Sequence, residues 1–385
     1  MGRRAFVVVI DACGAGELPD AASYGDAGAN TLLHVAQAVG GLQLPTLGAL
    51  GLGNILELPG VPPSRTPVLH GRLHPLGAGK DSTTGHWELM GVAVSQPPPT
   101  YPDGLDGELL ARVERTLGTP VLCNRPYNGL DAISDWGAEH LRCGHPILYT
   151  SQDSVLQLAA HVSVMSEPEL HAACAALRAE LSGQGEVRRV IARPFAGVPG
   201  AFERTLARRD YTLPPPSQSY LELLEEAGVE VHGVGKVTAL FDGVGITRAH
   251  PGATNAEAIE STGRLIGDLE GGLVFANLIE TDQRYGHRHD AEGFHRALQA
   301  IDRALASWLE ATGERDMLVI TADHGCDPAA AHTDHTREYA PLLARFAGHG
   351  GRRHDGPLAD VGASVLEWLT GEPARLGGHS FIGDA

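Results

Sequence analysis

Three stretches of the chain are almost continuously apolar, and each leads into an aspartate. They are AFVVVID at 5–11, GLVFANLIETD at 272–282 and MLVITADHG at 317–325. Runs rich in valine, leucine and isoleucine are typical of strands buried on both faces of a parallel sheet. The pattern therefore predicts three inner strands whose carboxyl ends meet at one edge of a sheet, which is where open α/β sheets bind ligands.

Segments with helical periodicity alternate with these strands. Residues 255–270 (NAEAIESTGRLIGDLE) and 291–312 (AEGFHRALQAIDRALASWLEAT) have the pattern of helices with one buried face. Asn255 is predicted to cap the first helix, because a short polar side chain at a helix start accepts a hydrogen bond from a free backbone N–H. The alternation of strand and helix predicts an α/β fold with a parallel-rich sheet flanked by helices.

Two proline-rich clusters divide the chain, QPPPTYPDG at 96–104 and YTLPPPSQ at 211–218. Such segments act as semi-rigid spacers and mark domain boundaries. The stretch between them is predicted to contain helices at 106–117, 131–142 and 167–181 and strands near 146–150 and 187–193. We therefore predict a core built from residues 1–97 and 216–385, with a smaller α+β cap domain inserted at 98–215.

The charge of the chain narrows the possible partners. A formal net charge of -18 over 385 residues repels nucleic acids and anionic membranes, so neither is predicted as a partner. A phosphate ligand would need a local positive charge, for which divalent metal ions are one candidate. No apolar stretch approaches the roughly 18 residues of a membrane span. The five cysteines are scattered without close pairs, which favours a reducing, cytoplasmic location.

Acidic and imidazole side chains gather where the three predicted strands end. With 19 histidines in the chain, a single one is more often a surface or hydrogen-bonded residue than a ligand. Three strand ends that each carry an aspartate, two with histidine nearby, are much harder to obtain by chance. Carboxylates and imidazoles together suit two ions such as manganese, zinc or iron. The predicted ligands are Asp11, Asp282, His287, Asp323, His324 and His335. Supporting or structural candidates are Asp334, His86, His289 and His332.

A glycine-flanked hydroxyl cluster, GAGKDSTTGHWELMG at 77–91, supplies candidate nucleophiles. Ser82, Thr83 and Thr84 can each be activated by a bound divalent ion, which lowers the pKa of a coordinated hydroxyl. The alternative is that the cluster merely caps a helix at GHWELM. Lys80 favours a chemical role, because the chain has two lysines against 27 arginines and keeps one of them here.

These motifs together resemble the phosphopentomutases of the alkaline phosphatase superfamily. The likeness runs through VVVIDACGAGELPDA, GKDSTTGHWELMG, YTSQDSVLQLAAH, RVIARPFAGVPGAFERT, TDQRYGHRHD and TADHGCDPAAAHTDHTREYAPLL. It implies an alkaline phosphatase-like core in which one ion is held by Asp11, Asp323 and His324, and the other by Asp282, His287 and His335. It also implies manganese as the metal, and an isomerase that interconverts ribose 1-phosphate and ribose 5-phosphate, with deoxyribose analogues accepted.

The resemblance also assigns the nucleophile and the substrate contacts. Ser82 falls where the family has a phosphorylated threonine, with Thr83 as the alternative, and Lys80 lies in the same motif. The implied reaction begins from a phosphoenzyme primed by a sugar bisphosphate and passes through a bisphosphate intermediate. The implied substrate-binding residues of the cap are Ser151, Asp153, Arg189, Arg193 and Arg204.

Two other functions fit parts of the pattern. A related phosphoglycerate mutase or a phosphatase would use the same core, but the cap motifs argue against both. A non-catalytic metal-binding protein would need the ligands alone and would leave the Ser82 segment without a role. Small-molecule pentose phosphates are therefore the predicted partners, and no oligomeric state is predicted.

Overall fold

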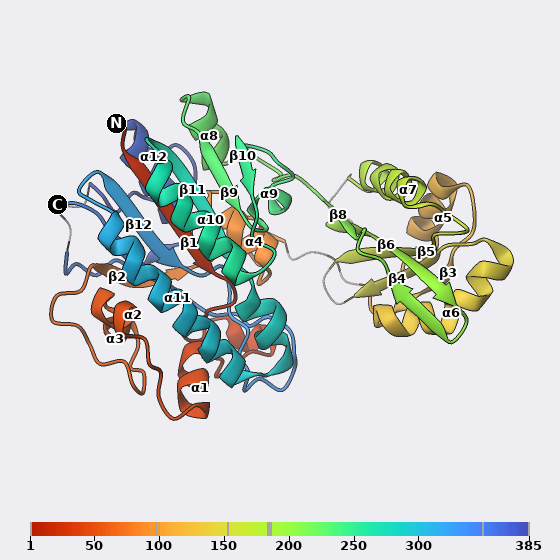
Figure 1. The fold of residues 1–385 in the computed structure, drawn as a ribbon, viewed down its shortest axis with the longest axis horizontal. Helices are drawn as coiled ribbons and strands as arrows, with labels where there is room; N and C mark the ends of the chain where they lie inside the picture. The colour runs from red at the N-terminus through yellow and green to blue at the C-terminus, as the bar shows by residue number, and fades with distance from the viewer. Residues whose placement is uncertain are drawn as a thin grey trace. The chain divides into compact units, whose positions relative to one another are not determined.

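The computed structural model describes residues 2–96, 99, 101–151, 154–182, 187–348 and 350–383. The chain divides into two compact units, Met1–Gln96 with Pro215–Ala385, and Pro97–Pro214. The predicted insertion, 98–215, differs from the second unit by one residue at each end. Each unit has its own sheet, and both sheets are visible in Figure 1.

The first unit is built on an eight-stranded sheet with the order β10-β9-β11-β1-β12-β13-β2-β14. Five neighbouring strands, from β10 to β12, are parallel, whereas β13 runs antiparallel to both β12 and β2. The bounds are β1 Arg4–Ile10, β2 Leu69–His74, β9 Val231–Val234, β10 Arg248–His250, β11 Gly272–Leu278, β12 Asp316–Thr321, β13 Ala340–Arg345 and β14 Gly356–Pro357. The α/β class with a parallel-rich sheet is confirmed.

The central strands are the three apolar runs of the sequence. β1 lies between β11 and β12, with Val9 opposite both Asn277 and Thr321. Every residue of β11 and β12 is buried, as is β1 beyond its first residue. Burial of both faces explains why these strands are continuously apolar, because each side chain is covered by a layer of helices.

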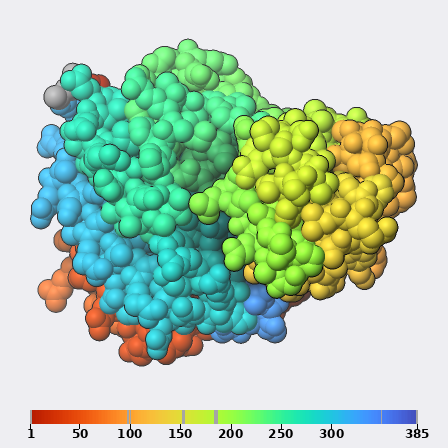
Figure 2. Space-filling view, turned by 45° about the vertical axis from the view of Figure 1, so that its right-hand side comes forward, coloured from red at the N-terminus to blue at the C-terminus, as the bar shows by residue number. Residues whose placement is uncertain are grey.

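Two groups of helices pack against this sheet. α10 (Asn255–Asp268) and α11 (Ala291–Ala311) contact each other, and α11 also contacts α1 (Thr31–Ala38) and α2 (Pro45–Leu50). The second group consists of α12 (Asp360–Thr370), α8 (Tyr220–Glu226), α4 (Ser82–Leu89) and α9 (Val237–Leu240). Short elements complete the unit: α3 (Leu52–Ile55), η1 (Ala21–Tyr24), η3 (Thr281–Tyr285) and η4 (Gly286–Arg288). The segments of α10 and α11 form much of the surface seen in Figure 2.

The predicted cap of α10 was wrong by one residue. Thr254 is the N-cap, and its side chain accepts a hydrogen bond from the Glu257 N–H. Asn255 is instead the first helical residue, and its side-chain oxygen accepts a hydrogen bond from the backbone of Glu280. Both residue types can cap a helix, so the choice was made by the tertiary contact between Asn255 and Glu280.

The second unit is an α+β domain with a six-stranded sheet. The strand order is β3-β4-β5-β6-β7, and β8 also pairs with β6. The strands are β3 Leu122–Pro126, β4 Ile147–Ser151, β5 Val155–His161, β6 Arg189–Val198, β7 Ala201–Arg204 and β8 Arg209–Thr212. The helices are α5 Gly107–Leu117, α6 Gly129–Cys143 and α7 Glu167–Glu180. One apolar cluster joins the sheet to α5 and α7, and a smaller one joins it to α6.

The described part of the chain contains no helix long and apolar enough to cross a membrane.

Candidate metal centre

The predicted ligands meet at the carboxyl end of the central parallel strands. Asp11 directly follows β1, and Asp323 lies two residues beyond β12. Asp282 lies in η3, a π-helical turn, which is a conformation often found at functional sites. The backbone also contributes, because Ala12 adopts a left-handed φ of 62° and its N–H donates to Asp323 Oδ1 at 3.1 Å. Strain of this kind is tolerated where surrounding contacts enforce it.

One group of possible ligands consists of Asp11, Asp323 and His324, and all three are buried. His324 Nε2 lies 3.4 Å from Asp11 Oδ1 and 3.3 Å from Asp323 Oδ2. His324 Nδ1 lies 3.0 Å from the carbonyl oxygen of Gly325, which suits a ring that donates from Nδ1 and offers Nε2 to an ion.

A second group is centred on Asp282. Its Oδ1 atom lies 3.4 Å from His287 Nε2 and 3.4 Å from His335 Nε2. His287 Nδ1 lies 2.6 Å from the carbonyl oxygen of Thr333, so this ring too is held through its outer nitrogen. All six predicted ligands therefore lie in two adjoining groups, and the two groups are joined where the His324 and His335 rings approach to 4.1 Å between centroids.

A thiol that the sequence reasoning did not include also lies in this second group. Cys326 Sγ is close enough to Asp282 and His287 to share an ion with them, and it lies 3.9 Å from His287 Nδ1. The thiol donates to the carbonyl oxygen of Asp334 at 3.7 Å. Cys326 could have been predicted from the sequence, because it lies two residues after His324. The segment that follows β12 carries three other ionisable site residues.

The site has the unsatisfied polar atoms expected of an ion-binding centre. Asp282 Oδ1, Asp323 Oδ2 and His335 Nε2 are buried and have no hydrogen bond of acceptable geometry to any described residue. Buried polar atoms without partners are rare because each costs free energy. The three atoms belong to two carboxylates and an imidazole, which is a donor set suited to borderline divalent ions. The residues therefore fit two divalent metal ions.

The protonation equilibria of the metal-free centre are strongly displaced. The close carboxylate of Asp282, together with the thiol of Cys326, raises the pKa of His287 to about 12. Burial alone would lower the pKa of His324, but the carboxylates of Asp323 and Asp11 raise it well above its usual value. Burial and the neighbouring charge of Asp323 raise the pKa of Asp11. Opposite charges thus balance one another in part in the metal-free protein.

This arrangement predicts that metal loading releases protons. The pKa values of His287 and His324 are both raised in the metal-free protein, and an imidazole must be neutral to bind an ion. We expect protons to leave on full loading, and apparent metal affinity to rise with pH. Titration calorimetry in buffers of different ionisation enthalpy measures the number. No proton release at pH 7 would contradict the prediction.

Among the three candidate hydroxyls, Ser82 is the one directed at the ligands. It is the first residue of α4, and its Oγ lies 3.3 Å from Asp11 Oδ1 and 3.1 Å from His324 Nε2. The cap of α4 is provided by other residues: Asp81 accepts from the N–H groups of Thr83 and Thr84, and the Thr84 hydroxyl returns a bond to Asp81. The capping and nucleophile interpretations of this segment therefore apply to different residues.

A buried layer of polar side chains supports these groups from behind. His86 Nδ1 lies 2.8 Å from the carbonyl oxygen of Ser82 and 3.2 Å from Asp323 Oδ2. Asn277 donates from Nδ2 to Asp11 Oδ2 at 2.9 Å and lies 3.2 Å from His86 Nε2. His86 was one of the predicted supporting candidates. Asn277 was not predicted, although a single polar residue inside the apolar run of β11 could have indicated its role.

Lys80 forms an ion pair near this site. Its Nζ atom is 3.0 Å from Asp26 Oδ2 and 3.8 Å from Asp334 Oδ2.

The predicted substrate-binding arginines lie in the second unit. Arg189 begins β6, where its Nη1 is 3.6 Å from Asp210 Oδ2. Arg193 Nε donates to Gln157 Oε1 at 3.0 Å, and burial together with the nearby Arg208 lowers its pKa to about 10.

The remaining predicted contacts are described in part. Arg204 is an exposed residue at the end of β7. Ser151 ends β4, and its side chain lies outside the described part of the chain, as does the whole of Asp153.

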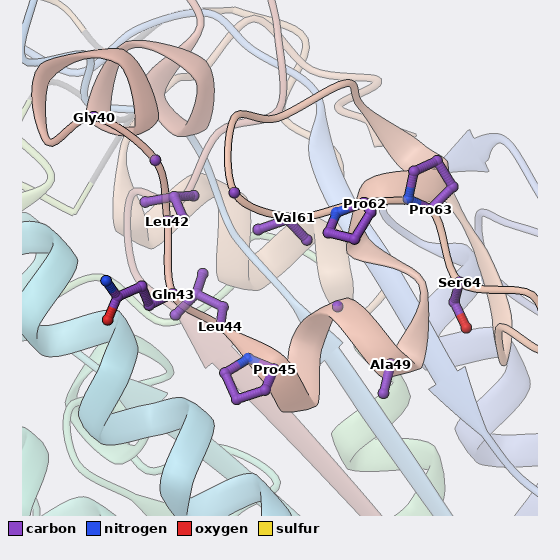
Figure 3. A pocket seen from close by; sticks show the side chains of 13 residues that line it. Gly40, Leu42, Gln43, Leu44, Pro45, Ala49, Val61, Pro62, Pro63 and Ser64 are labelled. Atoms are coloured by element: carbon purple, nitrogen blue, oxygen red, sulfur yellow. The ribbon is translucent and has the colours of Figure 1, made fainter.

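A separate hollow on the first unit carries none of this chemistry. It has a volume of about 570 Å³ and is formed by the loop before α2, by α2 itself and by the segment around Val61 (Figure 3). Its lining includes Gln43 and Ser64 but no histidine, carboxylate or thiol. The acidic and imidazole groups at the strand ends are therefore the better candidate for a catalytic centre.

Known proteins share this chain's sequence pattern and fold. Residues 3–373 match the family model of the metalloenzyme superfamily. A solved structure from Pyrococcus horikoshii aligns with a TM-score of 0.51, at 13% sequence identity, over 98% of this chain and 99% of that one, which supports the shared fold. The family match and the paired metal-binding groups thus define a member of the metalloenzyme superfamily.

Closer relatives narrow this class. The chain is 47% identical over 377 residues to a phosphopentomutase of Anaeromyxobacter dehalogenans, covering 96% of each protein. It is 43% identical over 389 residues to a phosphopentomutase of Dictyoglomus turgidum, covering 99% of this chain and 98% of that protein. The chain belongs to the phosphopentomutase family.

Proposed function

We propose that this chain is a phosphopentomutase that interconverts ribose 1-phosphate and ribose 5-phosphate, and their deoxyribose analogues, by way of a phosphoserine at Ser82. The observation that carries the proposal is the position of Ser82 Oγ, within 3.3 Å of both Asp11 Oδ1 and His324 Nε2 in a chain of this family. Family membership supports the isomerase class and the substrate class.

Each half of the centre has a distinct part in this proposal. Asp11, Asp323 and His324 would hold the ion beside the nucleophile, and Asp282, His287 and His335 would hold the other. When bound, the two ions supply positive charge for the nucleophile or leaving oxygen and for the phosphoryl group in transfer. Manganese is the metal we propose.

The protein's own residues then determine the course of the reaction. Phosphorylated Ser82 donates its phosphoryl group to the free hydroxyl of a bound pentose monophosphate: the bond from phosphorus to Ser82 Oγ breaks and a bond to the sugar oxygen forms. The product is a pentose bisphosphate, and in the net exchange the proton of the sugar hydroxyl passes to Ser82 Oγ, which becomes a free hydroxyl again. After reorientation, Ser82 Oγ accepts the other phosphoryl group. A sugar bisphosphate is proposed to prime the enzyme by the same exchange.

The decisive test is a comparison of substrates. The manganese-loaded enzyme, primed with a pentose bisphosphate, should convert ribose 1-phosphate to ribose 5-phosphate, as followed by phosphorus NMR. It should leave 3-phosphoglycerate unchanged and release little inorganic phosphate. Conversion of 3-phosphoglycerate, or hydrolysis faster than isomerisation, would favour the related mutase or a phosphatase. Intact-mass measurement should show one added phosphate on the primed chain, which a metal-binding protein without catalytic function would lack.

The arginines of the second unit are proposed to bind the phosphate of the substrate that is not transferred. Among the residues that the structure describes, Arg189 pairs with one carboxylate, Asp210, at 3.6 Å. Asp210 is also bound by Arg208 through two hydrogen bonds of 2.7 and 2.8 Å, so its charge is shared between two guanidinium groups. An arginine whose charge is incompletely balanced in this way suits a phosphate, which it can bind through two donors.

Arg189→Ala should therefore weaken substrate binding without disturbing the metal centre. We expect KM for ribose 5-phosphate to rise by at least about tenfold, since a charge-assisted contact contributes about 1.5–3 kcal/mol. Metal content should stay at the wild-type value. Arg142→Ala is the matched control, because Arg142 is an exposed arginine of the same unit that pairs with Glu139 on its own helix. Equal effects of the two substitutions would remove Arg189 from the substrate site.

A further inference from the structure

The carboxylate of Asp26 lies outside both groups of predicted ligands, yet it collects donors from two segments that carry site residues. Asp26 is buried, with 3% of its surface exposed. Lys80 Nζ lies 3.0 Å from its Oδ2, and His332 Nε2 lies 3.0 Å from its Oδ1. The backbone N–H of Arg337 donates to Oδ2 at 2.8 Å. A buried carboxylate is stable only when hydrogen-bond donors compensate for the loss of water, and Asp26 has such donors.

Each of these partners is a near neighbour of a predicted site residue. Lys80 precedes the nucleophile Ser82 by two residues. His332 and Arg337 stand on either side of His335, at distances of three and two residues along the chain. Asp26 thus connects the start of α4 to the loop after β12, two segments more than 240 residues apart in sequence.

Lys80 adds a second connection between the same two segments. Its ammonium group lies 3.8 Å from Asp334 Oδ2, and Asp334 is the residue directly before His335. The other carboxylate oxygen of Asp334 accepts the His335 N–H at 2.8 Å. The direction of the His335 ring toward Asp282 therefore depends on a backbone segment whose anchors include Asp26 and Lys80.

We infer that Asp26 is a positioning residue of the phosphoryl-transfer centre. Through Lys80 it holds the segment that presents Ser82, and through His332 and Arg337 it holds the loop that presents His335 to the second ion. Lys80 is then part of this support and does not contact the phosphoryl group in transfer. The inference rests on the proposed two-ion centre.

The charges around Asp26 explain why removal of its carboxylate should lower the affinity for the metal ion. Without Asp26, the ammonium of Lys80 retains Asp334 as its nearest acidic partner among those described, and it would draw that side chain toward itself. His335 follows Asp334 directly, so its ring would turn away from Asp282. Loss of residues that orient a metal ligand typically reduces metal affinity about 10- to 100-fold.

Asp26→Asn tests the inference in the full-length protein. We expect the manganese ion held by Asp282, His287 and His335 to bind at least about tenfold more weakly, as measured by the electron paramagnetic resonance signal of free Mn²⁺. The value of kcat for ribose 5-phosphate should fall, and KM should stay near that of the wild type. Asp20→Asn is the matched control. Asp20 binds the Arg337 guanidinium at 3.1 Å, so it lies on the same segment, but its side chain is half exposed.

Two further variants keep the test specific. His335→Ala should lose the same ion, so adding Asp26→Asn to it should cause little additional loss of manganese. Lys80→Met should resemble Asp26→Asn. If Lys80→Met abolishes isomerisation while both ions stay bound with wild-type affinity, Lys80 contacts the reacting phosphoryl group and the inference is overturned.

The remaining outcomes separate this inference from the proposed function. If Asp26→Asn and Asp20→Asn bind two ions with wild-type affinity and lower the melting temperature equally, Asp26 is a structural residue and the inference fails alone. A wild-type chain that binds fewer than two ions overturns the two-ion centre and this inference together.

Discussion

Replacing Ser82 with alanine is expected to abolish both the phosphoenzyme and the mutase reaction. Alanine has no oxygen to accept a phosphoryl group, and correct positioning of substrate cannot replace a reacting atom. The isomerase rate should fall by at least about three orders of magnitude, a typical loss when a nucleophile is deleted. Metal content and substrate affinity should remain, because Ser82 is proposed as neither a ligand nor a determinant of binding.

Two variants of the same segment show whether the reacting hydroxyl is correctly assigned. Ser82→Thr should keep the reaction, since the resemblance places a threonine at this position in the family. Thr83→Ala should keep it as well, because the backbone N–H of Thr83, and not its side chain, bonds to Asp81. Intact-mass measurement after incubation with a pentose bisphosphate reports the added phosphate. Uptake by Ser82→Ala together with failure of Thr83→Ala would move the nucleophile by one residue.

Removal of the divalent ions is expected to stop turnover completely. Three carboxylates and three imidazoles converge on the centre, and without ions the charge that steadies the transferring phosphoryl group is absent. The metal-free chain should also unfold at a lower temperature, because an ion at 100 times its dissociation constant stabilises the folded state by about 2.7 kcal/mol. Full activity after removal of metal, verified by elemental analysis, would exclude the two-ion proposal.

A ligand variant sharpens this prediction. His287→Ala should leave the ion of Asp11, Asp323 and His324 in place and lose the one shared by Asp282 and His335. His289→Asn is the matched control: His289 binds the carbonyl oxygen of His332 in the same loop, and asparagine tolerates its left-handed φ of 54°. Equal metal loss in the two variants would show that loop anchoring, rather than ligation, accounts for the effect of His287.

Much of the first unit was predictable because its central strands are buried on both faces. That burial requires continuous apolar runs, and the runs marked β1, β11 and β12 to within a few residues. The strands β13 and β2 were not predicted, because antiparallel pairing of β13 with β12 depends on contacts between distant segments. In the second unit, β7 and β8 are short and β7 is largely exposed, so they lack an apolar signal.

By itself, the sequence determined the class of fold, the aspartates at three strand ends and the histidines near them, because parallel strands bring their carboxyl ends to one edge. The tertiary structure alone decided which hydroxyl faces the ligands, since Ser82, Thr83 and Thr84 differ in direction around α4 and not in local pattern. It also decided that Thr254 rather than Asn255 caps α10, that Asp26 pairs with Lys80, and that Asn277 donates to Asp11. These choices rest on contacts between segments far apart in the chain, which local propensity and periodicity do not encode.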